Sequence, residues 1–179
     1  PVIHRAAALA GLLAGRALLA VAGTHGKTTT TGMAVTALRG AGHDPAWALG
    51  AAVPDLGRNA GLGADPAAAG IAEELAVVEA DESDGSFLAF APRALVVTNL
   101  EPDHLDFHGD AATLTAAFDA LTTQITPDGT LVVCADDPGA RALGDRAAAA
   151  GRTVVLYGAD DDAQWRLRAE RSGPRGAEI

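Results

Sequence analysis

Five short apolar runs divide the chain, and they constrain its fold more than any other feature of the sequence. They are residues 18–22, 75–80, 94–99, 130–135 and 153–158. Runs that are apolar at consecutive positions are typical of strands buried on both faces of a parallel sheet. Helical patterns over residues 111–125 and 138–150 separate the later runs. We therefore predict an α/β fold of P-loop type: a mostly parallel sheet with helices on both faces.

The segment that follows the first run predicts a phosphate-binding loop. It reads GTHGKTTTT, and its turn consists of Gly23, Thr24, His25 and Gly26. Lys27 comes next, and Thr28 to Thr31 would form the first turn of a helix. Backbone N–H groups at a helix N-terminus lack intrahelical partners and lie at the positive end of the helix dipole, so they bind phosphate well. Lys27 would add positive charge, and Thr28 would offer a hydroxyl to Mg²⁺.

The loop is a variant of the usual P-loop, because Val21 stands where the first glycine of that motif is expected. An ordinary strand–turn–helix with threonine capping is the alternative. Lys27 is the only lysine beside twelve arginines, which favours a dedicated role for it at phosphate. The helix after the loop is expected to bury Met33, Ala34, Ala37 and Leu38 and to end near Gly40. Residues 50–70 are predicted to be a loop.

Carboxylates gather after two of the predicted strands, in EADESD and TNLEPDHLD. The carboxyl ends of parallel strands meet at one edge of a sheet, which is where ligands bind. Carboxylates opposite a phosphate loop suggest Mg²⁺. Glu79 is the strongest candidate for a functional carboxylate at this Mg²⁺ site, because it directly ends an apolar run. For Asp84, Asp103 and Asp110 we favour solvated loop positions, while His25 could merely shape the turn and His108 stays open.

Composition excludes several classes of partner. A formal net charge of -10 argues against nucleic acid. No apolar stretch reaches the roughly 18 residues of a membrane helix, and we expect neither a signal peptide nor membrane association. Cys134 is the single cysteine, which fits a reducing compartment. We expect a cytoplasmic protein.

The motifs GTHGKTTTT, EADESDGSFL and VVTNLEPDHLDFHG, in this order, resemble those of the Mur ligases of bacterial cell-wall synthesis. The acidic motifs are most similar to the branch that joins L-alanine to UDP-N-acetylmuramate. The resemblance implies ATP and Mg²⁺ as cofactors. It implies Thr28, Glu79 and His104 as metal ligands, and Lys27, Glu79 and His104 as catalytic residues. The nucleotide site would then comprise Gly23, Thr24, His25, Gly26, Lys27, Thr28, Thr29 and Asn99.

The resemblance also implies a place in a larger protein. We expect residues 1–179 to be part of a central ATP-binding domain, with a core over about 17–158 and with the family's N-terminal UDP-binding and C-terminal domains absent. Alone, such a chain should be inactive. The carbamylated lysine of many relatives has no counterpart here, as in the alanine-adding branch. The alternatives are a murein tripeptide recycling ligase and a non-ligating nucleotide-binding module.

Overall fold

The computed structural model describes residues 2–63, 74–83, 85–102, 109–168, 171–173 and 176–178. Its α-helices and 3₁₀ helices are α1 (Arg5–Leu12), α2 (Lys27–Gly40), η1 (Pro54–Leu56), η2 (Ser86–Ala89), α5 (Ala111–Thr123) and α6 (Pro138–Ala149). Its strands are β1 (Ala17–Ala22), β2 (Ala46–Ala48), β3 (Ala60–Gly61), β4 (Leu75–Glu79), β5 (Ala94–Val97), β6 (Thr130–Cys134), β7 (Thr153–Gly158), β8 (Trp165–Arg166), β9 (Arg171–Gly173) and β10 (Gly176–Glu178).

Within the described residues, eight strands form one sheet in the order β3-β2-β4-β1-β5-β6-β7-β8. Every neighbouring pair is parallel except β2 and β3, which are antiparallel. Strand β1 lies between β4 and β5, and Val21 pairs with Glu79 on one side and Val96 on the other. The predicted mostly parallel sheet is confirmed, and the glycine turn after β1 lies between the ends of β4 and β5.

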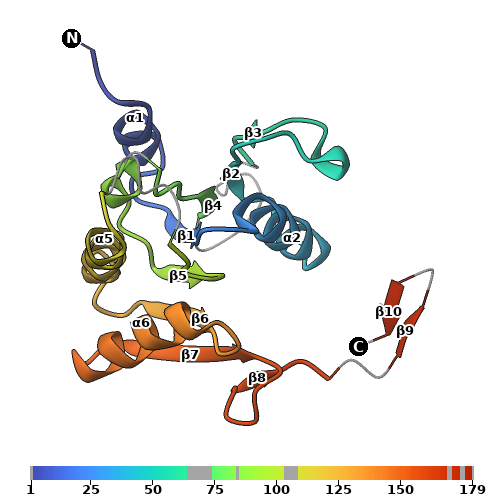
Figure 1. Ribbon diagram of the computed structural model, residues 1–179. Helices are drawn as coiled ribbons and strands as arrows, with labels where there is room; N and C mark the ends of the chain where they lie inside the picture. The colour runs from blue at the N-terminus through green and yellow to red at the C-terminus, as the bar shows by residue number, and fades with distance from the viewer. Residues whose placement is uncertain are drawn as a thin grey trace.

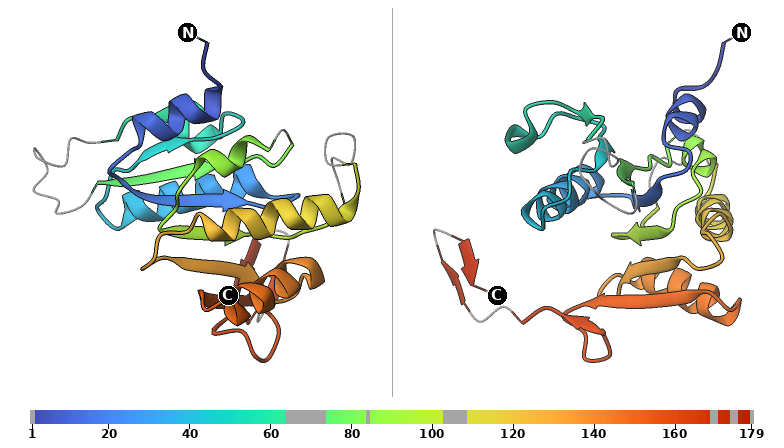
Figure 2. Two further views of the ribbon diagram at one scale, coloured as in Figure 1. Left: turned by 90° about the vertical axis from the view of Figure 1, so that its left-hand side faces the viewer. Right: turned by 180° about the vertical axis from the view of Figure 1, so that it is seen from behind.

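Helices cover both faces of the sheet, as predicted. Helices α1, α5 and α6 pack on the face that carries the larger core, in which Phe87 and Phe118 meet edge to face with ring centroids 5.4 Å apart. Helix α2 packs on the other face, where Val35, Trp47 and Val77 form a second cluster. Figure 1 shows α1 and α5 on one side of β1 and β4 and α2 on the other. Figure 2 shows the same layers from the side and from behind.

Helix α2 buries the predicted stripe only in part: Ala34 and Leu38 are half-buried against the second cluster, whereas Met33 and Ala37 are exposed. Thr31, Gly32 and Val35 are its buried residues, whereas Met33 is 59% exposed. Thr31 can be buried because its hydroxyl donates to the Lys27 carbonyl oxygen at 2.8 Å, so no polar group is left unpaired. A threonine that satisfies its own hydroxyl packs through its methyl group, and a pattern of purely apolar residues misses it.

Residues 50–70 were predicted to be a loop, and the described part of this segment contains more structure than that. Pro54–Leu56 forms η1, and Ala60–Gly61 forms β3 at the edge of the sheet. A Cβ on Gly61 would lie 2.6 Å from the Trp47 indole nitrogen, so the strand approaches β2 through a residue without a side chain. A two-residue strand containing glycine carries no apolar alternation, which explains why the sequence does not reveal it.

Of the helices described, none is long and apolar enough to cross a membrane.

Tyr157, the only tyrosine, supplies a pH test of the packing between β6 and β7. Burial, together with the Cys134 thiol on the neighbouring strand, raises the pKa of Tyr157 from 10.0 to about 12. The fold therefore favours the neutral phenol. Its contribution to stability is complete below pH 10 and is lost as the pH rises through about 12, because the unfolded chain ionises first. We expect the ultraviolet absorbance of the phenolate to appear with a midpoint near 12, and the free energy of unfolding to fall between pH 10 and 12.

The control for this prediction is Tyr157→Phe, which keeps the ring and removes the ionisable group. The variant should show no phenolate absorbance and a smaller loss of stability over the same pH range. A phenolate midpoint near 10, measured while circular dichroism shows that the protein is folded, would contradict the prediction.

Candidate functional site

The candidate site lies at the carboxyl ends of β1, β4 and β5, where the glycine turn, Glu79 and the segment after β5 come together. Gly23 follows β1 with a φ of 130°, a conformation that L side chains rarely adopt. Gly26 caps α2 with a φ of 81°. Because the Thr30 N–H is bonded to the Gly26 carbonyl oxygen at 2.9 Å, the N–H groups of the preceding positions are free of the α2 ladder. The turn is thus built as a helix N-terminus suited to an anion.

The segment after β5 holds the glycine turn in shape. The His25 N–H donates to Asn99 Oδ1 at 2.8 Å, and Asn99 Nδ2 donates to the His25 carbonyl oxygen at 3.1 Å. Thr98 Oγ1 donates to the same His25 oxygen at 2.7 Å. Asn99 and His25 therefore meet through backbone atoms of the turn, and the side chain of His25 takes no part in these bonds. Direct contact of either residue with nucleotide stays a prediction.

Thr24 links the turn to the same segment. Its hydroxyl donates to the Glu101 carbonyl oxygen at 3.2 Å and accepts from the Glu101 N–H at 3.0 Å, while its own N–H donates to the Asn99 carbonyl oxygen at 3.2 Å. Both polar groups that Thr24 could offer to a ligand are thus used inside the protein. Thr24 is buried, and its role in this structure is to fix the turn.

Two of the predicted metal ligands are in contact. Thr28 Oγ1 donates to Glu79 Oε1 at 2.9 Å, although 51 positions separate them in the chain. The other carboxylate oxygen, Glu79 Oε2, accepts from the Gly50 N–H at 2.7 Å. A hydroxyl and a carboxylate are the hard oxygen donors that Mg²⁺ prefers, so the pair fits that ion. Gly50 was not identified from the sequence, because a backbone amide that follows β2 leaves no signal in residue type.

Lys27 is held by three acceptors. Its Nζ donates to the carbonyl oxygens of Gly23 at 2.8 Å and Thr24 at 3.3 Å, and it forms an ion pair with Glu82, with distances of 3.0 Å to Oε1 and 2.9 Å to Oε2. The Glu82 side chain is 1% exposed and that of Lys27 is 11% exposed. The sequence places Glu82 in an acidic cluster without assigning it a role, so this buried pair is a finding of the structure.

The third predicted metal ligand, His104, lies outside the described residues, as do Asp84, Asp103 and His108. Among the residues that are described, no group of three histidine, cysteine, aspartate or glutamate side chains could hold a metal ion. Asp110 is described, and it caps α5: its side chain accepts from the Thr113 N–H at 2.7 Å. That bond holds the pKa of Asp110 below its usual value, in keeping with a structural role.

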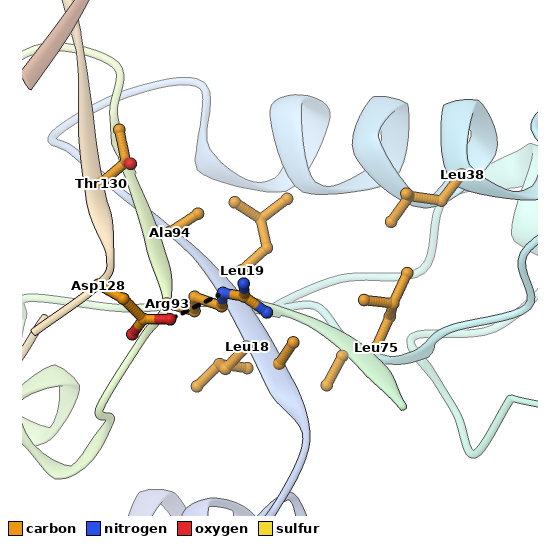
Figure 3. Close-up of a pocket in the computed structure, with 10 residues that line it drawn as sticks. Leu18, Leu19, Leu38, Leu75, Arg93, Ala94, Asp128 and Thr130 are labelled. Atoms are coloured by element: carbon orange, nitrogen blue, oxygen red, sulfur yellow. Dashed lines mark ion pairs between the residues drawn. The ribbon is translucent and has the colours of Figure 1, made fainter. Parts of the chain in front are cut away.

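A pocket of about 370 Å³ opens beside Glu79. Its lining combines the charged residues Arg5 and Asp81 with the polar groups of Gly50, Asn59 and Ser86 and with apolar residues of α1 and Phe90. A second pocket, of about 420 Å³, lies at the opposite edge of the sheet, where β1, β4, β5 and β6 begin. Figure 3 shows it lined by Leu18 and Leu75, with Arg93 and Asp128 paired at 3.6 Å. Only the first pocket adjoins the Thr28–Glu79 pair, so only it belongs to the candidate site.

Comparison with known proteins agrees with this geometry. The family model described as "Mur ligase middle domain" matches residues 21–177. A UDP-N-acetylmuramate–L-alanine ligase from Arthrobacter sp. (strain FB24) is 53% identical over 168 residues, which are 93% of this chain and 34% of that relative. The chain therefore spans about a third of the length of this curated relative.

Two solved structures have the same fold. A UDP-N-acetylmuramate:L-alanyl-γ-D-glutamyl-meso-diaminopimelate ligase from Neisseria meningitides is 28% identical, with a TM-score of 0.83 over 98% of this chain and 55% of that one. A UDP-N-acetylmuramate–alanine ligase from Thermotoga maritima is 29% identical, with a TM-score of 0.61 over 79% of this chain and 29% of that one.

Gly23→Ala tests the close approach of the turn to β5. A Cβ at Gly23 would lie 2.1 Å from Thr98 Oγ1, and the φ of 130° would be strained as well. We expect the variant to lose about 3 kcal/mol of unfolding free energy, because the steric contact and the strained φ would each destabilise the fold. Urea denaturation followed by circular dichroism measures this loss.

The matched control is Gly11→Ala in α1, where a Cβ would meet nothing within 4 Å. That change should be neutral or should add up to about 1 kcal/mol, because alanine favours a helix. Equal stability of the two variants would contradict the close contact.

Proposed function

The chain belongs to the Mur ligase family, as its middle domain, and we propose that it is the ATP-binding part of a ligase that joins L-alanine to UDP-N-acetylmuramate. The observation that carries this proposal is the contact between Thr28 and Glu79 beside the glycine turn. It brings a hydroxyl from a helix N-terminus and a carboxylate from a neighbouring strand to the point where a nucleotide phosphate would lie. The identity of 53% to an alanine-adding ligase supports the choice of substrates.

The reaction has two steps. The carboxylate of UDP-N-acetylmuramate attacks the γ-phosphorus of ATP, and ADP leaves with the electrons of the broken phosphorus–oxygen bond. The amine of L-alanine then attacks the carbonyl carbon of the acyl phosphate, inorganic phosphate leaves, and the amine gives up a proton as the amide forms. Phosphoryl transfer depends on alignment and on neutralising charge more than on covalent help from the protein.

The residues of the site match those demands. Lys27 and the N–H groups at the start of α2 would bind the phosphates, with Gly23, Thr24, His25, Gly26 and Thr29 shaping or lining the loop. Thr28, Glu79 and His104 would hold Mg²⁺, which when bound neutralises phosphate charge. Asn99 would keep the loop in the geometry that accepts the nucleotide. The pocket beside Glu79 would admit the carboxylate that is phosphorylated.

The remaining contacts would come from other parts of the ligase. In this proposal residues 1–179 form most of the central domain, and separate domains bind the uridine nucleotide and bring the amino acid. The chain alone would then bind Mg·ATP weakly and would not turn over, because positioning of the reactants can be worth roughly 7–11 kcal/mol of the barrier.

A murein tripeptide ligase is the second candidate. The specific observation in its favour is the TM-score of 0.83 to the Neisseria structure, the higher of the two structural matches described above. The sequence favours the alanine-adding branch, since the relative that is 53% identical is an alanine-adding ligase.

Domain exchange tests the proposal directly. We expect this chain to restore ligation when it replaces the matching region of the Arthrobacter alanine ligase, and to restore much less in the Neisseria ligase. Phosphate release and product formation, each with the host's own substrates, are the measurements. Lys27→Ala in the active hybrid should lower the rate by several powers of ten, because the lysine lies at the phosphate loop. The change also leaves the buried Glu82 carboxylate without its cation, so circular dichroism must show that the hybrid is folded before its rate is read. The reverse preference between hosts would favour the tripeptide ligase, and an active Lys27→Ala hybrid would rule out the proposed site.

Thr28→Val and Glu79→Gln test the shared Mg²⁺ site in the chain itself. Each should weaken binding of Mg·ATP, and the double variant should lose less than the sum, because either change already disorganises the pair. Calorimetry across a Mg²⁺ titration measures both effects, with ATP alone as the metal-free reference. Thr36→Val is the matched control, since Thr36 lies on the same helix and its hydroxyl donates to the Gly32 carbonyl oxygen. Strictly additive losses with an unchanged Mg²⁺ requirement would reject a common site.

A further inference from the structure

The ammonium of Lys27 has no donor left for a phosphate in the nucleotide-free chain. A lysine carries three N–H donors, and here the acceptors are the Gly23 and Thr24 carbonyl oxygens and the Glu82 carboxylate. A phosphate that enters the glycine turn must therefore displace one of these acceptors before Lys27 can bind it.

The carboxylate is the acceptor that a phosphate displaces. It lies within 3.0 Å of Nζ through both oxygens and is almost fully buried, so its charge is not screened by water. A phosphate beside Lys27 would bring a second anion toward Glu82, and like charges in a poorly hydrated site repel strongly. The two carbonyl oxygens carry no net charge and belong to the turn itself, so they can stay in contact with the ammonium.

The position of Glu82 allows Lys27 to bind either Glu82 or a phosphate. It follows Glu79 by three residues at the end of β4, and its carbonyl oxygen accepts from the Gly85 N–H at 3.2 Å in a turn that leads into η2. Glu82 thus approaches Lys27 from β4, whereas the phosphate-binding N–H groups belong to α2. The lysine can exchange one anion for the other by rotating its side chain, while the backbone of the glycine turn keeps its shape.

We propose that Glu82 is a positioning residue that holds Lys27 in the nucleotide-free state and competes with nucleotide phosphate for its ammonium. Phosphate binding draws Lys27 away from Glu82, and phosphate departure returns it. Glu82 therefore lowers nucleotide affinity and keeps the lysine beside the loop between turnovers. This inference rests on the proposed nucleotide function, but the hold of Glu82 on Lys27 can be measured without any nucleotide.

The single lysine makes that measurement selective. Acetylation by an amine-reactive ester modifies only Lys27 and the N-terminal amine, and mass spectrometry of the cleaved peptides distinguishes the two. We expect Glu82→Gln to raise the acetylation rate of Lys27 by about tenfold, the size of one lost charge-assisted hydrogen bond. Glu82→Asp keeps the charge but is one methylene shorter, and it should give an intermediate rate. This second variant keeps the test valid if the glutamine form does not fold.

The matched control is Glu74→Gln. Glu74 immediately precedes β4, as Glu82 closely follows it, and it too is ion-paired, with Arg16 Nε at 3.0 Å. It lies at the opposite edge of the sheet, so its loss should leave Lys27 acetylation unchanged. An acetylation rate that is the same in wild type, Glu82→Gln and Glu74→Gln would overturn the proposal.

Calorimetry with ADP and with Mg·ATP completes the test. Glu82→Gln should bind both severalfold more tightly than wild type, since it removes the competing anion, and Glu74→Gln should bind them as wild type does. Weaker binding by a folded Glu82→Gln would overturn the proposal and would mean that Glu82 orients Lys27 toward phosphate. If no variant binds nucleotide while acetylation still rises in Glu82→Gln, the hold on Lys27 is upheld and the proposed nucleotide function fails.

Discussion

The parallel pairing of β1 with β4 and β5 is the constraint on which the rest of the site depends. It sets the register in which Val21 pairs with Glu79 and Ala22 pairs with Val97, so the glycine turn leaves β1 between a carboxylate and the Thr98–Asn99 segment. A slip of one residue would exchange the two faces of β4 and carry Glu79 away from Thr28. Residues of β4 alternate between the two cores, with Ala76 and Val78 in the larger cluster and Val77 in the other, so a slip would also exchange the side chains that pack in each core.

Both carboxylates of the site have hydrogen-bonding partners before any ligand arrives. Glu79 is bonded by a hydroxyl and a backbone amide, and Glu82 by the only lysine of the chain. Glu82 is thus paired with a cation beside the phosphate loop, whereas the partners of Glu79 are neutral donors. A buried carboxylate next to an anion-binding turn is costly unless it is paired, which explains why Lys27 lies against Glu82 in this structure.

Much of the fold follows from the sequence, because the five apolar runs and the two later helices are defined by short-range patterns. The contact between Thr28 and Glu79 could also be expected. Thr28 closely follows β1 and Glu79 ends β4, and the carboxyl ends of neighbouring parallel strands lie together. Gly50 and Glu82 could not be assigned: their roles depend on the path of a loop and on which of several acidic side chains turns inward. The strand β3 and the buried Thr31 were missed because glycine and threonine carry little apolar signal. His104 stays a prediction from the motif.

The segment after β5 is hydrogen-bonded to two other parts of the fold, and these bonds limit which substitutions the chain can tolerate. Thr24 bonds Glu101, while the Leu100 N–H donates at 2.9 Å to Asp137, whose same oxygen accepts from the Ala140 N–H at 2.7 Å to cap α6. One aspartate thus serves both a helix on the outer layer and the strand end that supports the glycine turn. A substitution of Asp137 would therefore remove the cap of α6 and, at the same time, the support of Leu100. Through Leu100 and Asn99 the same substitution would also affect the phosphate loop.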